Sequence, residues 1–462
     1  MSSPLPSRRD FLKGAGAIGA SSLLLGSTTA RAADPARRAA GGKARNLIFL
    51  VVDGMGTGTL SLAHFWHLRH KDSPLNWTRF YGLPGVVTSL QDTASASSPV
   101  TDSAAAGSAW GGGQRIANGA INVTMDGKAL TPLWTHAKAA GKATGLVSTC
   151  RITHATPAAF AAAVADRDLE DAIADQYLER EVDVIMGGGL RHFKNHERDL
   201  LPEFEKKGYH LALDAEQLAA AKGRRKVLGL FTPSHVPYAI DRENDERLDL
   251  VPGLVPMFEA ALESLAGRDN GFVLQVESGR VDHAGHANDA AAILREQLEF
   301  DRCIAVAERF LREHPDTLVV LTTDHGTGGC QLNGSGERYN DSGPALDRIN
   351  AFTHSFEAME RHYRSIGRFD PEHFEAKTGI RPTSGQRDEV QNAVEADTKY
   401  LNSLMTRVFA EELLASTGVG WTSNKHTAEC VELLALGPGV EGMPAFLKNH
   451  ELHGILREAL GI

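Results

Sequence analysis

The stretch GFVLQVESGRVDHAGH, residues 271–286, joins an apolar run to a cluster of carboxylates and imidazoles. The run predicts a buried strand that begins near Gly271, and a helical pattern starts after Asn288. Between them lie two carboxylates and two imidazoles, those of Glu277, Asp282, His283 and His286. A strand that leads into a helix through polar residues is typical of an α/β fold, in which ligands bind at the carboxyl ends of strands.

Further apolar runs end in polar, often Gly-rich turns in the same way, at residues 46–56, 142–150, 182–189, 317–326 and 430–439. Helical patterns lie between most of them, as at 131–141 and 289–314. Strands that alternate with helices imply βαβ units and a mainly parallel sheet, and unbroken apolar strands fit burial on both faces. The sequence therefore predicts an α/β three-layer sandwich, with helices on both faces of a central sheet.

The alternation is interrupted between about residues 329 and 420, where the chain becomes polar and partly helical. We interpret this part as an insertion that leaves the main domain and re-enters it. A separate C-terminal domain is the alternative, but the apolar run at 430–439 favours one domain that resumes.

Net charge restricts the classes of ligand. The chain of 462 residues has a net charge of −10, and its first 32 residues carry four basic residues against one acidic residue. The remainder therefore stands at −13, which argues against nonspecific binding to nucleic acid, because that binding depends on cationic surface. An anionic substrate is still compatible with this charge, since bound metal ions reverse the local field.

The N-terminus predicts a signal peptide over residues 1–32. SRRDFLK at 7–13 is a twin-arginine pattern, an apolar stretch of small residues follows, and Ala30-Arg31-Ala32 fits a signal-peptidase site. We expect export by the twin-arginine route, so that the protein is periplasmic or secreted; a disordered basic tail is the alternative. The apolar stretch is too short and Gly-rich for a membrane span, and no later segment predicts one.

The cysteines do not form a metal-binding pattern. Cys150, Cys303, Cys330 and Cys430 show no CxxC spacing, so a thiolate zinc site is not expected. Outside the cytoplasm they could form disulfides, with three possible complete pairings. Cys303 lies in a helical pattern that predicts burial.

Seven potential metal ligands fall at or near the predicted strand ends: Asp53, Glu277, Asp282, His286, Asp324, His325 and His426. Each alone is more often a turn or capping residue. Because a parallel sheet brings such ends to one rim, the set favours a common site. Carboxylates and imidazoles without sulfur suit zinc or a similar divalent ion.

The segment PVTDSAAAGSAWGGG, residues 99–113, predicts a helix that begins near Ser103. There the Ser103 hydroxyl would lie among unpaired N–H groups at the positive end of the helix dipole. A neighbouring metal could ionise it, which would make it a nucleophile. The alternative is that Asp102 or Ser103 is only an N-cap.

Five motifs in this order resemble the alkaline phosphatases: VVDGMG at Asp53, TDSAAAG at Ser103, residues 277–286, TTDHG at Asp324 and NKHTAE at His426. The resemblance implies a catalytic domain over 46–462 that hydrolyses small phosphate monoesters to an alcohol and inorganic phosphate. Relatives are often homodimers, so a homodimer is also implied, although no interface pattern stands out in the sequence.

The resemblance implies a role for each residue by position. Ser103 would be the nucleophile that becomes phosphorylated, and Arg167 would hold two phosphate oxygens in bidentate geometry. Two zinc ions and one magnesium ion are expected. Their ligands would be Asp282, His286 and His426 for one zinc, Asp53, Asp324 and His325 for the other, and Asp53, Thr156 and Glu277 for magnesium.

His154 and His283 depart from the pattern of many bacterial relatives, which carry Asp and Lys at these positions. Both residues match animal enzymes, and the resemblance places both near the phosphate. The identity of the third metal stays open for this reason.

Three other functions fit the sequence less well. A sulfatase needs a CxPxR-type motif, which CRITH at 150–154 does not supply. A phosphodiesterase of the same superfamily usually lacks the third metal site, so Glu277 and Thr156 favour monoesters. A non-catalytic periplasmic metal-binding protein would not need Ser103 and Arg167 beside the ligands.

Overall fold

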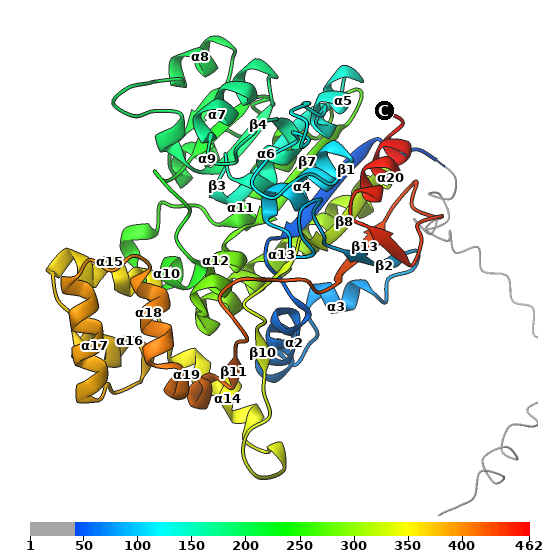
Figure 1. Ribbon diagram of the computed structural model, residues 1–462. Helices are drawn as coiled ribbons and strands as arrows, with labels where there is room; N and C mark the ends of the chain where they lie inside the picture. Colours follow the sequence, from blue (N-terminus) through cyan, green and yellow to red (C-terminus); the bar gives the residue numbers. More distant parts are fainter. Residues whose placement is uncertain (1–41) are drawn as a thin grey trace, which may run out of the picture.

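The computed structural model describes residues 42–462, so the expected signal peptide at 1–32 lies outside it. A ten-stranded sheet lies at its centre, with helices against both faces (Figure 1). In spatial order the strands are β14 (Phe446–Lys448), β2 (Val87–Asp92), β13 (Val431–Leu436), β8 (Thr317–Thr323), β1 (Asn46–Val52), β7 (Phe272–Ser278), β3 (Ala143–Arg151), β4 (Val184–Gly188), β6 (Val227–Leu230) and β5 (His210–Ala212).

The sheet is mainly parallel. All neighbouring strands in it pair in parallel except β13, which runs antiparallel to both β2 and β8. The predicted α/β fold with a mainly parallel sheet is therefore confirmed.

Alternating side chains of β1 divide the core into two layers. Ile48 and Leu50 pack in one apolar cluster, and Leu47 and Phe49 pack in the other. The first cluster includes side chains of α2 (Thr57–Lys71), α3 (Asn76–Phe80), α9 (Ala215–Ala220), α10 (Ala239–Asn244), α11 (Leu254–Leu265) and α13 (Ala290–Glu313). The second includes those of α4 (Ser103–Gly112), α5 (Leu133–Ala139), α6 (Ala155–Ala161), α7 (Glu170–Glu179), α8 (Leu201–Lys206) and α20 (Glu451–Leu460). Burial on both faces explains why these strands are apolar without interruption.

The carboxyl ends of β1, β7 and β8 lie side by side in the middle of the sheet. Val52 of β1 pairs with Ser278 of β7 and with Thr323 of β8. Asp53 and Asp324, the next residues along their chains, therefore leave the sheet at the same level. This register places the candidate ligands in one region.

Residues 329–420 form a mostly helical part beside the sheet. Its ends are held together, because β10 (Gln331–Leu332) and β11 (Val419–Gly420) pair antiparallel. Between them lie α14 (Ser342–Arg348), α15 (Phe356–Ile366), α16 (Pro371–Thr378), α17 (Ser384–Glu395), α18 (Leu401–Val408) and α19 (Ala410–Thr417). Helices α15 to α18 make a lobe beside α12 (Arg280–Ala287), at the lower left of Figure 1. Their buried apolar side chains belong to the same cluster as those of α13.

All four cysteines lie within the described residues, and none of them forms a disulfide there. Cys303 is buried in α13, as predicted, and Cys430 is exposed. Among the helices of residues 42–462, none is long and apolar enough to cross a bilayer.

Candidate active site

Asp53, Asp324 and His325 form a first group at the carboxyl ends of β1 and β8. Nε2 of His325 lies 3.6 Å from Oδ1 of Asp53 and 3.1 Å from Oδ2 of Asp324. All three side chains are buried. Burial raises the pKa of Asp53 well above its usual value, and the nearby carboxylates raise it further.

Asp282, His286 and His426 form a second group. The first two lie one turn apart on α12, and His426 begins the short strand β12 (His426–Thr427), which pairs with β9 (Gly326–Thr327) just after His325. Nε2 of His286 and Nε2 of His426 lie 3.4 and 3.5 Å from the Asp282 carboxylate.

In each of these two imidazoles, the hydrogen bond made by Nδ1 determines which ring nitrogen carries the proton. Nδ1 of His286 can donate to the carbonyl of Asn424, and Nδ1 of His426 to that of Thr101, each at 2.8 Å. This leaves two Nε2 lone pairs only 3.0 Å apart and beside a carboxylate. Metal-ligating histidines typically donate their other N–H in this way, so the arrangement fits a shared divalent cation.

Asp53, His154 and Glu277 bring ligand atoms within 4.8 Å of one another, which makes a third group. Glu277 is near the end of β7, and His154 precedes α6, where Thr156 lies. Burial raises the pKa of Glu277 to about 7, and the carboxylate accepts a hydrogen bond from Ser148.

Six buried polar atoms in or beside the first and third groups have no hydrogen-bond partner among residues 42–462: Oδ1 and Oδ2 of Asp53, Oδ2 of Asp324, Oε1 of Glu277, Oγ1 of Thr156 and Nδ1 of His154. Buried polar atoms are normally paired, and unpaired buried carboxylates are costly. Oxygen and imidazole donors suit hard or borderline divalent ions. The donor set therefore fits bound metal ions at the positions where the sequence predicts them.

Ser103 is the first residue of α4, and the helix cap is its neighbour. Oδ1 of Asp102 accepts from the N–H of Ala105 at 2.9 Å, so Asp102 is the N-cap. The Ser103 hydroxyl therefore does not cap the helix, and it lies 3.2 Å from Nε2 of His325. The alternative that Ser103 itself is only a cap is wrong.

Arg167 is positioned by two partners, one of which is Asp102, the neighbour of Ser103 in the chain. Nη1 donates to Oδ2 of Asp102 at 3.0 Å, and Nη2 donates to Nε2 of His154 at 3.2 Å. Burial lowers the pKa of Arg167, but the charge and hydrogen bond of Asp102 raise it by more. The guanidinium therefore stays charged.

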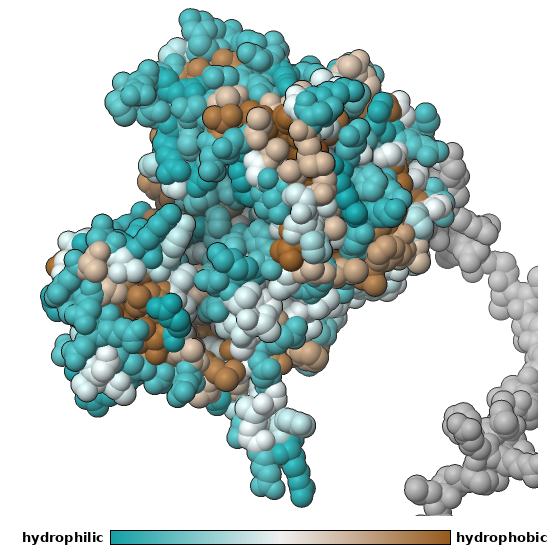
Figure 2. Space-filling model, in the orientation of Figure 1, coloured by the Kyte–Doolittle hydropathy of each residue, from teal (hydrophilic) through white to brown (hydrophobic). Residues whose placement is uncertain are grey.

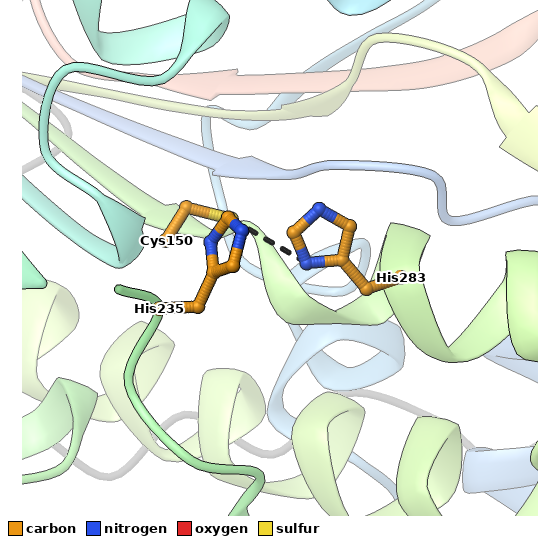
Figure 3. A group of neighbouring side chains, drawn as sticks. All are labelled: Cys150, His235 and His283. Carbon is orange, nitrogen blue, oxygen red and sulfur yellow. Dashed lines mark hydrogen bonds between the residues drawn. The ribbon is translucent and has the colours of Figure 1, made fainter. Parts of the chain in front are cut away.

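His283 lies close to Cys150 and to His235, a residue that the sequence did not single out (Figure 3). Nδ1 of His283 is 3.9 Å from Sγ of Cys150, but Arg280 also donates to that Nδ1 at 2.7 Å. Arg151 donates to the ring of His235. Because guanidinium groups occupy these ring nitrogens, the three side chains form a packed cluster, with one hydrogen bond between Cys150 and His283, rather than a metal centre. Burial lowers the pKa of His283 to about 3, so this imidazole is neutral.

The second ligand group opens into a pocket of about 590 Å³, the active-site pocket. Ser103, Arg167, His154 and His283 line it, together with the second ligand group. The lobe contributes Glu357, Tyr400, Asn402 and Ser403, and Figure 2 shows the surface hollowed between the lobe and the rest of the molecule. Sequence reasoning missed these lobe residues. It also missed His235, which follows the end of β6 and could have been found by the same strand-end pattern.

A family model for alkaline phosphatase matches residues 44–462. This chain belongs to the alkaline phosphatase family. Alkaline phosphatase 4 of Bacillus subtilis is 32% identical to it over 426 residues, which are 90% of this chain and 88% of that protein. The protein is thus a phosphatase of a family that hydrolyses phosphate monoesters and generally uses metal ions.

Solved structures of alkaline phosphatases share the fold. The enzyme of Thermus thermophilus is 34% identical, with a TM-score of 0.83 over 95% of this chain and 96% of its own. A cold-active enzyme of a Shewanella species is 30% identical, with a TM-score of 0.77 over 90% and 99% of the two chains.

A twin-arginine signal model matches residues 6–24. This match confirms the predicted export route and a periplasmic or secreted location.

Proposed function

We propose that this alkaline phosphatase hydrolyses phosphate monoesters through a phosphoserine at Ser103, with two zinc ions and one magnesium ion. The observation that supports the proposal is the Ser103 hydroxyl, which lies 3.2 Å from Nε2 of His325 in the first ligand group and lines the same pocket as Arg167. In the first step the Ser103 oxygen would attack phosphorus and the alcohol would leave. In the second step water would attack the phosphoserine, which releases inorganic phosphate and restores the serine.

We assign the metals by group. Asp282, His286 and His426 would hold one zinc, and Asp53, Asp324 and His325 the other. When bound, the zinc held by Asp282, His286 and His426 would stabilise negative charge on the leaving-group oxygen and later lower the pKa of water. The zinc held by Asp53, Asp324 and His325 would lower the pKa of the Ser103 hydroxyl.

Asp53, Thr156 and Glu277 would hold magnesium. His154 lies beside this group, but its Nε2 accepts from Arg167, so its Nδ1 carries the proton and is not a metal ligand in this arrangement. A third site is also the feature that favours monoesters over diesters.

Arg167 would bind two phosphate oxygens with its planar guanidinium. Its pairing with Asp102 fixes the guanidinium plane before substrate arrives, which lowers the entropic cost of binding. His154 and His283, both neutral, would contact the phosphate or its water shell.

The domain organisation belongs to the same proposal. We propose a signal peptide over 1–32 and a catalytic domain over 46–462, into which residues 329–420 are inserted.

Ser103→Ala tests the covalent step. The variant should lose activity on a monoester by more than about 10³-fold and should not incorporate labelled phosphate. Ser61→Ala, an exposed serine on α2, is the matched control and should keep both properties. A Ser103→Ala enzyme that retains substantial activity would contradict the phosphoserine route. Equal rates of the wild-type enzyme on a monoester and on the matched diester would contradict the monoester preference.

A further inference from the structure

A second pocket of about 360 Å³ adjoins the active-site pocket and is called here the outer pocket. The two pockets share five lining residues: His286, Ala287, Tyr400, Ser403 and Asn424. The outer pocket therefore begins at the second ligand group and extends along α18.

The charge of the outer pocket is opposite to that of the whole chain. Lys399 and Arg407 line it, and its lining, all of it within the described residues, contains no Asp or Glu. Neither cation forms an ion pair with another described residue; the nearby Asp397 is paired with Arg364 instead. In a chain of net charge −10, two unpaired cations beside a catalytic pocket indicate affinity for an anion.

Tyr400 stands between the two pockets in an unusual backbone conformation. Its φ of 58° and ψ of 50° are left-handed, which is a strained state for a bulky residue, and its side chain is exposed. Nζ of Lys399 lies 4.8 Å from the centre of its ring. The turn at Tyr400 directs the chain into α18 and presents Lys399 and Tyr400 at the pocket wall.

The outer pocket is anchored to the ligand helix. Oγ1 of Thr406 on α18 donates to the carbonyl of Ala287 at 2.6 Å, and Oγ of Ser403 donates to that of His286 at 3.4 Å. The chain segment that carries Lys399 and Arg407 is therefore attached to the ligand helix beside His286.

We propose that the outer pocket binds a second anionic group on the leaving group, so that preferred substrates are monoesters whose alcohol carries a further phosphate. The inference rests on the proposed function, in which the leaving-group oxygen faces Asp282, His286 and His426. A leaving group on that side extends past His286, the residue that opens into the outer pocket. Lys399 and Arg407 would then bind its distal phosphate, while Tyr400 would cover the connecting chain.

Matched synthetic substrates test this inference. We would compare alkane-α,ω-diol bisphosphates with three to eight carbons with the ω-hydroxyalkyl monophosphates of the same lengths. The bisphosphates should have the higher kcat/KM at one or more lengths, beyond the factor of two for two equivalent ends, mainly through a lower KM. Lys399→Gln and Arg407→Gln should each reduce that preference by about three-fold to ten-fold, and high salt should reduce it as well.

The controls separate this inference from the proposed function. Lys206→Gln, an exposed lysine on α8, removes the same charge far from the pocket and should leave the preference unchanged. The Lys399 and Arg407 variants should hydrolyse the monophosphates at wild-type rates, which also shows that they are folded. A preference that is absent, or that survives both substitutions, would overturn the inference even if Ser103 is the nucleophile. Activity of Ser103→Ala on the monophosphates would instead overturn the proposed function.

Discussion

Asp102 uses its two carboxylate oxygens for two different tasks. Oδ1 caps α4 through Ala105, and Oδ2 accepts hydrogen bonds from Arg167 and from the N–H of Gly119, both at 3.0 Å. One side chain therefore fixes both the helix that presents Ser103 and the guanidinium expected to bind phosphate.

Asp102→Asn separates these tasks. The amide oxygen of asparagine can still cap α4, so the melting temperature should change little. The lost negative charge leaves Arg167 less firmly positioned, and the inhibition constant for inorganic phosphate should rise by about three-fold to ten-fold. Phosphate inhibition kinetics and thermal unfolding measure the two effects. An unchanged inhibition constant with a large loss of stability would mean that Asp102 acts only as a cap.

The turn after β1 packs directly against α12. Gly54 has a φ of +80°, and a Cβ at this position would lie 2.5 Å from Cα of Asp282. No side chain fits there unless α12 moves, and α12 carries Asp282 and His286. The close approach of these two elements thus determines where the second ligand group lies.

Gly54→Ala should therefore disturb the ligand group. We expect a loss of catalytic rate of about 100-fold and lower metal content, because small displacements of reacting groups are costly. Gly208→Ala is a matched control, since Gly208 has a φ of +85° but no atom of the described part of the chain lies within 4 Å of the added Cβ. The control should lose stability through backbone strain and keep its metal and activity. Equal metal loss in both variants would show that strain, not the contact with Asp282, is responsible.

The elements that sequence reasoning found are the long ones. The predicted strands at 46–56, 271–278 and 317–326 correspond to β1, β7 and β8, whose side chains are buried on both faces. It missed β2, whose side chains are only partly buried, β6, which has four residues, and β5 and β14, which have three residues each. Short or half-exposed strands carry little apolar signal, and their pairing partners decide whether they form.

The metal ions should also stabilise the molecule as a whole, because the buried carboxylates of Asp53, Glu277 and Asp324 lie close together at the carboxyl ends of the central strands. In the metal-free protein the pKa of Glu277 is about 7, against an ordinary value of 4.5. Its contribution to folding is therefore fully present below about pH 4.5 and is lost as the pH rises through 7. Bound metal requires the ionised carboxylate, so metal binding stabilises more as the pH rises.

Thermal unfolding of metal-loaded and chelated protein at pH 6 and pH 8 tests this. The difference in free energy of unfolding between the two forms should be larger at pH 8, by about 1 kcal/mol or more. Distant groups titrate alike in both forms, so their contributions cancel in the difference. Glu277→Gln removes the titrating carboxyl and should reduce the growth of the difference. A difference that does not change with pH would contradict the raised pKa of Glu277.

The sequence by itself determined the fold class and the inventory of ligands. Apolar runs that end in Asp, Glu and His show where strands stop, and parallel strands place such ends at one edge whatever the details of packing. Asp53, Glu277, Asp324 and His325 could be found in this way because each belongs to a strand end that is visible in the local pattern.

Only the tertiary structure decided what surrounds those ligands. The lobe of helices α15 to α18 packs beside α12 and supplies Tyr400 and Lys399 from over a hundred residues along the chain, through contacts that no local pattern records. The pairing of Asp102 with Arg167 and the close approach of Gly54 to Asp282 are likewise contacts between distant segments. Local sequence sets the periodicity of strands and helices. Which side chains meet depends on how whole elements pack, and packing is a property of the complete core.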